Sequence, residues 1–309
     1  DSISSFKLLH METQLLRAFL TVADQQSVSK AAERLHLTQP AISKQVQSLE
    51  SQLGIALFDR IGRRLNLTEA GRIFMPRAQA ILQQLEESQR ELRNLHAQVS
   101  GPLTLATSHH IGLHRLPPVL RRYAEAYPQV DLQIEFLDSE AAYAQVLQGR
   151  FELAVITLAP EIDPRLDARL LWSDRLRFVA APHHPLASRR RLSLQQLAQH
   201  RATLPDLSTY TGQIVERLFA GAGIRLNRGM ATNYLETLKM MVSIGLGWSL
   251  LPQTMVDAGM VPLDVAVPPI ERPLGVILHR ARSLSNAARI FLELLIDSAD
   301  RSEAGGNRG

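Results

Sequence analysis

Polar side chains that can hydrogen-bond to base pairs recur along one short segment of this sequence. Gln39, Ser43, Lys44 and Gln47 follow one another at intervals that place them on one face of a helix. A glutamine amide can bond an adenine edge, a lysine ammonium can reach guanine or a phosphate, and a serine hydroxyl can serve either role. The chemistry that this segment could perform is recognition of double-stranded DNA. The alternative is an ordinary amphipathic helix whose outer face is only hydrated.

The rest of the segment supplies the elements that would position these side chains. The opposite face of the same helix is apolar, with steps of four, three and four residues between Ile42, Val46, Leu49 and Leu53. Residues 28–35 show helical spacing as well, Thr38 can cap the second helix, and Pro40 suits its first turn. Residues 27–53 are therefore predicted to form a helix-turn-helix, whose second helix is shaped to enter the major groove.

An arginine-rich segment follows directly. Residues 57–67 read LFDRIGRRLNL, in which Gly62 permits a turn and Arg60, Arg63 and Arg64 gather positive charge beside it. A basic hairpin in this position typically lies on the phosphate backbone or in the minor groove. A hydrated loop is the alternative, but the place of the segment directly after the second helix favours a wing that contacts DNA.

Residues 11–68 resemble the winged helix-turn-helix of the LysR-type transcriptional regulators. The resemblance is carried by LRAFLTVAD, S-x-S-K-A-A-E-R-L, T-Q-P-A-I-S-K-Q, L-E-x-Q-L-G-I-x-L-F-x-R and L-T-E-A-G. Lys44 departs from the arginine that many relatives carry, and a lysine cannot make the two-pronged hydrogen bonds of arginine. The resemblance and the spacing together give the residues expected to contact DNA: Ser27, Thr38, Gln39, Pro40, Ser43, Lys44, Gln47, Arg60, Arg63 and Arg64.

A long helix is expected after the wing, from a cap at Thr68 to about His96, with a local bend at Pro76. Apolar residues step alternately by four and three along it, which is the pattern of a coiled-coil seam. Packing against the chain's own DNA-binding domain is the alternative. The seam residues expected to hold two copies of the chain together are Phe74, Ala78, Ile81, Leu85, Leu92 and Leu95.

From Leu103 onward, short apolar strands alternate with amphipathic helices, which predicts parallel-rich sheets covered by helices. The family resemblance implies an α+β multidomain protein: an all-α winged helix-turn-helix with a long linker helix, then two α/β lobes similar to periplasmic binding proteins. The predicted divisions are a DNA-binding domain (11–67), a linker and dimerisation helix (68–99), an effector-binding domain (102–300, with lobe I at 102–171 and 272–300 and lobe II at 172–271), and terminal extensions (1–10 and 301–309).

Small hydroxyl and imidazole side chains occur where strands are expected to end and helices to begin. Open α/β sheets bind ligands there, and helix N-termini offer free N–H groups that suit anions. By resemblance, segments 107–110 and 208–211 line the effector cleft, although each hydroxyl alone could be a plain helix cap. The full set expected to bind a small, anionic effector is Thr107, Ser108, His109, His110, Ser139, Thr157, Ser208, Thr209, Tyr210 and Thr211.

Three histidines close together raise a metal-site hypothesis. Adjacent histidines such as His109 and His110 rarely point together at a strand end, and no acidic residue nearby in the sequence completes a ligand set with His114. Neither a metal site nor a cofactor is therefore expected. A histidine that contacts the effector, or senses its charge near neutral pH, is favoured instead.

Composition limits the remaining possibilities. The 309 residues suffice for two or three domains, and a net charge of only +4 means that any surface for nucleic acid must be local. No apolar run approaches the roughly 18 residues that span a bilayer, and residues 1–10 lack the apolar core of a secretory leader. Cysteine is absent, which excludes disulfides and cysteine-ligated zinc. A cytoplasmic protein without a membrane partner is expected.

These observations favour a ligand-responsive bacterial transcription factor. It would bind double-stranded DNA, a small effector, RNA polymerase and further copies of itself, as a homotetramer by resemblance, and the effector would act by changing the angle between the lobes. A solute-binding transport component built on the same lobes is one alternative, against which the DNA-reading segment argues. An enzyme is the other, but the sequence has no G-x-S-x-G, P-loop or H-E-x-x-H motif, and no G-x-G-x-x-G after a strand.

Overall fold

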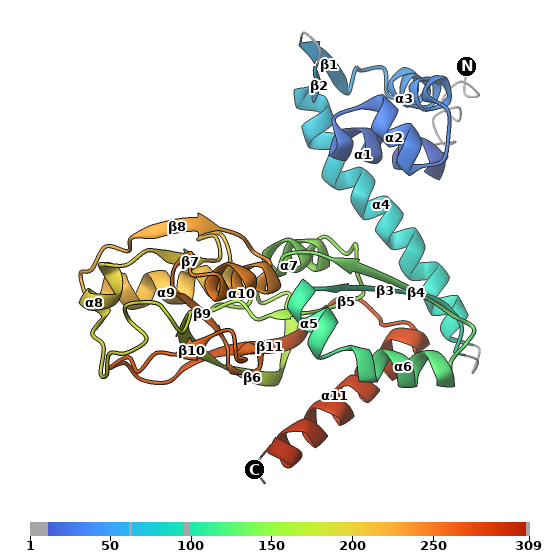
Figure 1. Cartoon of the computed structure of the whole chain (residues 1–309). Helices are drawn as coiled ribbons and strands as arrows, with labels where there is room; N and C mark the ends of the chain where they lie inside the picture. Colours follow the sequence, from blue (N-terminus) through green and yellow to red (C-terminus); the bar gives the residue numbers. More distant parts are fainter. Residues whose placement is uncertain (1–11, 62–63, 96–98, 307–309) are drawn as a thin grey trace, which may run out of the picture. The chain divides into compact units, whose positions relative to one another are not determined.

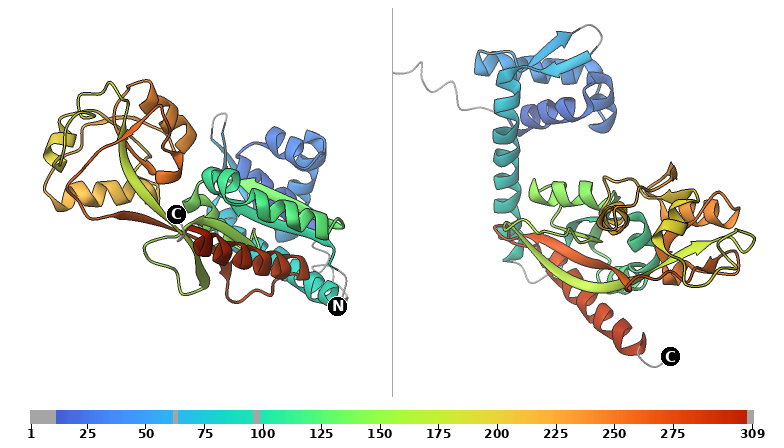
Figure 2. Two further views of the ribbon diagram at one scale, coloured as in Figure 1. Left: turned by 60° about the horizontal axis from the view of Figure 1, so that its bottom comes forward. Right: turned by 90° about the vertical axis from the view of Figure 1, so that its left-hand side faces the viewer.

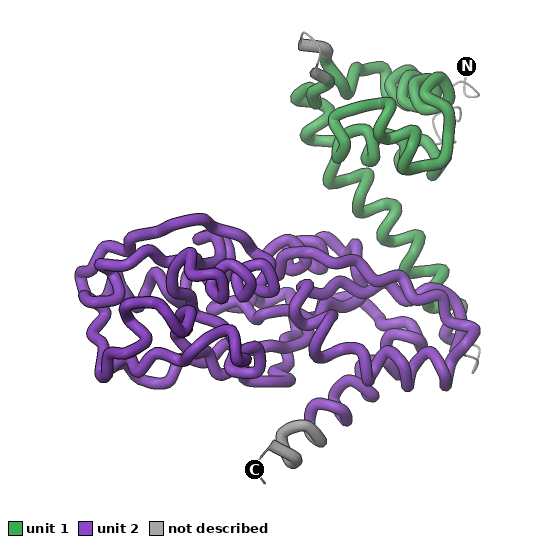
Figure 3. The backbone as a smooth tube through the Cα atoms, in the orientation of Figure 1, with its two compact units in different colours: residues 1–92 green, residues 93–309 purple. Residues whose placement is uncertain are grey.

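The computed structural model describes residues 12–61, 64–95 and 99–306. The backbone divides into two compact units, residues 1–92 and 93–309 (Figure 3). Each unit has hydrophobic clusters of its own, as separate domains do. Across the described ranges, no helix is both long and apolar enough to cross a bilayer.

The first unit combines helices with one hairpin (Figure 1). Its described elements in chain order are α1 (Thr13–Gln25), α2 (Val28–Arg34), α3 (Gln39–Leu53), β1 (Phe58–Ile61), β2 (Arg64–Leu67) and α4 (Glu69–Asn94). The hydroxyl oxygens of Ser27, Thr38 and Thr68 accept hydrogen bonds from backbone N–H groups three residues ahead. The caps predicted at Thr38 and Thr68 are therefore confirmed. Gly54 ends α3 in the left-handed conformation, with φ of 68°.

An apolar core beneath α3 holds the helix-turn-helix together. Ile42, Val46 and Leu49 are buried in clusters shared with α1. Ala31 on α2 is fully buried in the same core, and its small side chain lets neighbouring helices approach closely. The apolar face predicted for the second helix is thus confirmed.

The hairpin after α3 is antiparallel and pairs Phe58 with Leu67. Glu50 of α3 holds its first strand, because the Oε1 atom accepts hydrogen bonds from the N–H groups of Leu57 at 2.7 Å and Phe58 at 3.1 Å. These bonds to a carboxylate are stronger than ordinary ones, so they tie the hairpin to the helix.

The second unit is an α/β domain (Figures 1 and 2). Its described elements are β3 (Gly101–Thr107), α5 (His109–His114), α6 (Pro117–Ala126), β4 (Val130–Phe136), α7 (Ser139–Leu147), β5 (Leu153–Thr157), β6 (Leu166–Ala180), α8 (Leu194–Ala198), β7 (Ala202–Leu204), α9 (Tyr210–Gly221), β8 (Arg228–Ala231), α10 (Leu235–Ser243), β9 (Ser249–Pro252), η2 (Gln253–Met255), β10 (Val261–Pro262), β11 (Ile270–His279) and α11 (Asn286–Gly306).

A mixed sheet runs through this unit in the order β10-β6-β11-β5-β3-β4, and β9 also pairs with β6. Strand β3 is parallel to β4 and β5, and β7 forms a separate parallel pair with β8. The long strands β6 and β11 instead run antiparallel to each other and to their other neighbours. The prediction of parallel-rich sheets is therefore wrong for the part of the sheet formed by β6, β11, β9 and β10, whose pairings are antiparallel.

Strands β6 and β11 join two hydrophobic cores. Trp172 on β6 is buried in a core with β3, β5, α6 and α11, which we call lobe I. Leu176, four residues later on the same strand, is buried in a core with β7, β9 and α9, which we call lobe II. The predicted lobe boundaries, at 171/172 and 271/272, fall within β6 and near the start of β11.

Both faces of strand β5 are buried within lobe I. Leu153 and Val155 pack in the core with α6 and α11, which lie side by side on that face (Figure 2). Ala154 and Ile156 pack in a second cluster with α7. Burial on both faces explains the unbroken apolar run of this strand. Thr157 follows at its carboxyl end, the position where open α/β sheets bind ligands.

Candidate functional site

The outer face of α3 presents hydrogen-bonding groups to solvent. Gln39, Lys44 and Gln47 are exposed and Ser43 is half-buried, opposite the core-facing side of the helix. Pro40 is also exposed in the first turn. This face therefore carries amide, hydroxyl and ammonium groups that are free to meet a partner.

Ser27 and Thr38 have a structural role that does not exclude a second one. Their hydroxyl oxygens cap α2 and α3 by accepting hydrogen bonds from Lys30 N and Ala41 N, each at 3.4 Å. A hydroxyl that accepts one hydrogen bond can still donate its own hydrogen. Both residues can therefore donate to a phosphate oxygen at the start of a helix.

The basic cluster of the wing is described only in part. Arg60 and Arg64 lie in β1 and β2, but the structure describes their backbone and not their side chains. Gly62 and Arg63 lie outside the described residues. The DNA contact expected for these arginines stays a prediction.

The apolar stripe of α4 divides into a buried and an exposed part. The Phe74 ring lies 5.4 Å from that of Phe19, and Ala78 is fully buried in the same cluster, so both contribute to the core of their own domain. These two positions follow the alternative of packing within the domain. The positions that remain open to a partner, which we call the α4 stripe, are Ile81, Leu85 and Leu92 on the helix and Leu95 directly after its end.

A cavity of about 450 Å³ opens between lobe I and lobe II. It is lined by side chains from both lobes and from strand β11. The predicted residues that line it are Ser108, His109, His110, Ser139, Thr157, Thr209 and Thr211. Residues outside the predicted set line it as well: Phe136, Leu137, Asp138, Glu140, Ala141, Pro205, Asn233, Tyr234, Leu235 and Arg272.

Three predicted residues do not line this cavity. The Thr107 hydroxyl is turned into the sheet, where it donates a hydrogen bond to the Val155 carbonyl at 2.9 Å. Ser208 is exposed on the loop before α9. Tyr210 donates its backbone N–H to Glu140, and its ring lies 6.5 Å from that of Tyr143.

Several hydroxyls in the cavity wall already have partners. Ser139 Oγ accepts a hydrogen bond from Thr157 N at 3.1 Å. Thr209 Oγ1 caps α9 by accepting from Gly212 N at 3.0 Å, and it donates to the Asp206 carbonyl at 2.7 Å. Ser108 differs, because it precedes α5 without a side-chain capping bond. Its hydroxyl therefore has no capping role and can serve a ligand.

Arg272 is the most informative residue that the sequence did not reveal. It lies on β11 between the lobes and is only 4% exposed. Its guanidinium donates to Asp174 Oδ2 at 2.7 Å and reaches Thr211 Oγ1 at 3.5 Å, while Nε is buried without a hydrogen-bond partner. Burial lowers the pKa of Arg272, and Asp174 opposes that shift. The available signal was an arginine placed directly before the apolar run of β11.

Asp174 is the partner that keeps this charge in place. It stands opposite Arg272 in the register of β6 and β11, and it also accepts a hydrogen bond from Arg115 at 2.7 Å. Burial opposes ionisation of this carboxyl, but hydrogen bonds from His110, Arg272 and Arg115 hold its pKa well below the usual value. Two guanidiniums thus share one carboxylate, so Arg115, Arg272 and Asp174 together carry one net positive charge beside the cavity.

Hydrogen bonds cross the cavity from one lobe to the other. Glu140 on α7 of lobe I accepts a hydrogen bond from the backbone N–H of Tyr210, the first residue of α9 in lobe II. Asp138 Oδ2 accepts another from Asn233 Nδ2 at 2.7 Å. Burial raises the pKa of Glu140, and hydrogen bonds from the backbone N–H groups of Glu140 and Tyr210 counter this shift only in part. The two carboxylates therefore already occupy donors that lobe II offers.

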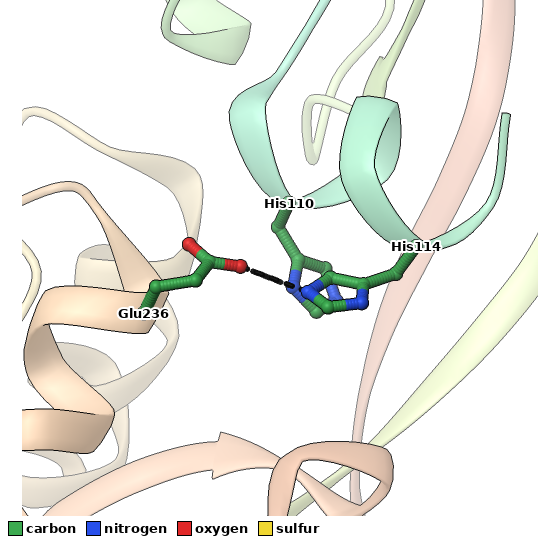
Figure 4. A group of neighbouring side chains, drawn as sticks. All are labelled: His110, His114 and Glu236. Atoms are coloured by element: carbon green, nitrogen blue, oxygen red, sulfur yellow. Dashed lines mark hydrogen bonds and ion pairs between the residues drawn. The ribbon is translucent and has the colours of Figure 1, made fainter. Parts of the chain in front are cut away.

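The three histidines of α5 do not share one environment. The His109 ring lies between those of Phe136 and Tyr234, at 5.5 and 5.2 Å. The His110 and His114 rings lie 4.7 Å apart, and the Glu236 carboxylate of α10 lies beside both of them (Figure 4). The sequence offered no acidic residue near these histidines, but the fold brings Glu236 to His114 from 122 residues away.

Two family models match this chain. Residues 13–72 match the bacterial regulatory helix-turn-helix protein model of the lysR family, and residues 96–300 match the LysR substrate binding domain. The RuBisCO operon transcriptional regulator of Allochromatium vinosum is 30% identical over 298 residues, which cover 95% of this chain and 98% of that regulator.

Solved structures share the fold at lower identity. CbnR, in a complex of the full-length protein with its target DNA, gives a TM-score of 0.62 at 21% identity and covers 94% of this chain and 100% of its own. The CcmR regulatory domain of Synechocystis PCC6803, in complex with 2-PG, gives 0.59 at 21% identity and covers 65% of this chain and 98% of its own. These matches, helical domain and α/β domain together, confirm the predicted fold class.

Proposed function

Since this chain belongs to the LysR family of DNA-binding transcriptional regulators, we propose that its effector-binding domain holds a small anion on Arg272. A regulator of this kind is not an enzyme, so the cleft has to bind a ligand and report on it rather than convert it. The observation that carries the proposal is the buried guanidinium between the lobes, whose Nε has no partner.

The wall of the cleft suits an anion with at least two oxygens. Arg272 offers a charged donor, Ser108 a hydroxyl without a capping role, and Thr211 a second hydroxyl near the guanidinium. Charge-assisted hydrogen bonds of this type are the strong ones in a buried site. CcmR, whose regulatory domain binds 2-PG, provides a related example of a small molecule in this fold.

We infer that the effector acts by changing the contacts between the lobes. The cleft is bounded by lobe I and lobe II, and the Glu140 and Asp138 hydrogen bonds already join them. A ligand that binds one arrangement of the lobes more tightly shifts the population toward it. This differential binding would couple the cleft to the DNA-binding unit through the assembly.

We further propose that α3 reads the operator and that the α4 stripe pairs two chains. The exposed Gln39, Lys44 and Gln47, with Ser43, supply the base-contacting groups, and Ser27 and Thr38 supply phosphate contacts. CbnR bound to its target DNA is a related protein in which this fold meets DNA. Pairing through Ile81 and Leu85 would set the distance between two half-sites.

The anion proposal is tested by thermal unfolding of the full chain with single compounds. The set contains sulfate, phosphate, small mono- and dicarboxylates, 2-PG, and neutral compounds of similar size. A ligand at 100 times its Kd stabilises the folded state by about 2.7 kcal/mol, which is a readily measured shift. A shift produced by neutral compounds and by none of the anions would overturn the proposal.

A further inference from the structure

We propose that His110, His114 and Glu236 form a binding site for a divalent transition-metal ion of the zinc class. Their ligand atoms all lie within 4.8 Å of one another. Glu236 Oε1 lies 3.0 Å from His114 Nε2 and 3.6 Å from His110 Nδ1, and the three side chains converge on one point (Figure 4). The site joins α5 of lobe I to α10 of lobe II, which is a role beyond effector binding.

The two separations from Glu236 are close to those between ligand atoms on a tetrahedral ion. Zinc binds histidine nitrogen and carboxylate oxygen at about 2.0–2.2 Å, so two ligand atoms on one ion stand roughly 3.3–3.5 Å apart. The distances of 3.0 and 3.6 Å from Glu236 Oε1 bracket this value. The two histidine nitrogens lie within 4.8 Å of each other, so side-chain rotations that bring them closer would seat an ion among the three groups.

Helical spacing brings the two histidines together. His110 and His114 are four residues apart on α5, which places both on one face of the helix. Two histidines at this spacing, joined by a glutamate from elsewhere, are a ligand set that zinc uses in proteins. Three protein ligands also leave a fourth position for water or for an oxygen of another ligand.

Unsatisfied atoms at the site give independent support. His110 Nδ1 and Glu236 Oε2 are buried without a hydrogen-bond partner. A buried lone pair that lacks a donor costs free energy, and a bound cation removes that cost. His110 Nδ1 is one of the proposed ligand atoms, and Glu236 Oε2 belongs to the carboxylate that supplies another.

A second carboxylate orients one of the ligands. His110 Nε2 lies 3.6 Å from Asp174 Oδ2, which favours a proton on Nε2 and leaves the Nδ1 lone pair for the metal. The guanidiniums of Arg115 and Arg272 oppose a cation nearby, but both are paired with Asp174 at 2.7 Å, which weakens their repulsion. The alternative is a plain ion pair between protonated histidines and Glu236.

The test titrates Zn²⁺ alone into the chelator-treated full chain by isothermal calorimetry. We expect one tight site per chain. His114→Ala and Glu236→Gln should each weaken it by more than the 10–100-fold that is typical of an outer-shell partner. His109→Ala is the matched control, because this neighbouring histidine packs against Phe136 and Tyr234 and should leave the site intact.

The chain has ten histidines, so a second control excludes binding elsewhere. The His184 and His200 rings lie 5.3 Å apart, and His184→Ala removes that pair. A tight site that survives in Glu236→Gln, or that is lost in His184→Ala instead, overturns the proposal, as does the absence of a tight site in the unaltered chain. His114 and Glu236 are partly exposed, and circular dichroism checks that the variants fold.

Cobalt provides a second readout that a structural ion pair cannot produce. Tetrahedral Co²⁺ with nitrogen and oxygen ligands has visible absorption bands, which should appear in the unaltered chain and in His109→Ala. They should be missing in Glu236→Gln. Because no anion is added, failure of this experiment leaves the Arg272 anion site untouched, and the two proposals are tested separately.

Discussion

The Glu140 carboxylate accepts a hydrogen bond from the backbone N–H of Tyr210, and so connects α7 of one lobe to the first turn of α9 in the other. The N-terminus of a helix is a natural site for an anion, because its first N–H groups are free and its dipole end is positive. Here an internal carboxylate occupies that place. Glu140 therefore competes with an effector for the same donors and also adds negative charge to the cleft.

Glu140→Gln should strengthen anion binding. The amide oxygen can still accept the Tyr210 hydrogen bond, but the negative charge that opposes an anion at Arg272 is gone. We expect an affinity gain of about 1 kcal/mol, or roughly fivefold, for a partly screened charge of this kind. Calorimetric titration with sulfate measures it. Unchanged or weaker sulfate binding would show that this carboxylate does not oppose the ligand.

The pH dependence of sulfate binding should report the same carboxyl. Burial raises the pKa of Glu140 above its ordinary value of 4.5, so this group takes up a proton earlier than other glutamates as the pH falls. Sulfate stays doubly charged over this range. Affinity should therefore rise as the pH falls into the range where Glu140 takes up its proton, and this rise should be smaller in Glu140→Gln, which lacks the carboxyl. Equal slopes in the two proteins would contradict this assignment.

Ser108→Ala should weaken anion binding by roughly 10- to 150-fold, because a hydrogen bond to a charged group contributes about 1.5–3 kcal/mol. The Ser108 side chain does not cap α5, so the substitution should leave the stability of the domain nearly unchanged. Ser139→Ala is the contrasting variant, since its hydroxyl accepts the Thr157 N–H and its loss should lower the free energy of unfolding. Thermal unfolding with and without sulfate separates the two effects.

The helix-turn-helix was predictable because its determinants are local. Thr38 caps α3 through a bond to Ala41, and the apolar face of Ile42, Val46 and Leu49 follows from spacing within one helix. Such short-range patterns are visible in a single sequence. The hydroxyl residues at strand ends were likewise found by their position, and most of them do line the cleft.

The cleft's charged residues were not predictable, because strand register and lobe packing bring them together. Asp174 and Arg272 are 98 residues apart and meet only as cross-strand partners of β6 and β11. Glu236 reaches His114 from a helix in the other lobe. A periodic pattern within one segment of the sequence does not indicate such long-range contacts. Phe74 and Ala78 show the converse, because a correct helical stripe did not reveal which part packs within the domain.

Ser43→Ala combined with Lys44→Ala should abolish selective binding to operator DNA and leave self-association intact. Both side chains lie on the outer face of α3, away from its core, so the fold should be retained. Loss of a base-contacting pair costs about 1–3 kcal/mol per contact, and loss of one phosphate contact lowers the salt slope by about one. Lys239→Ala, a lysine of lobe II, is the matched control. Retained selectivity in the double variant would place the reading face elsewhere.

Leu85→Asp should separate the chains that the α4 stripe holds together. Leu85 is 38% exposed, and Ile81, one helical turn earlier, is 46% exposed, so neither is needed for the core of its own domain. A carboxylate in a coiled-coil seam would have to be buried without a partner, which costs several kcal/mol per pair of chains. Sedimentation velocity should therefore show a smaller assembly for Leu85→Asp. Glu87→Ala, a change on the same helix outside the stripe, should leave the assembly unchanged. Identical assemblies for Leu85→Asp and the unaltered chain would exclude the stripe as the main contact between subunits.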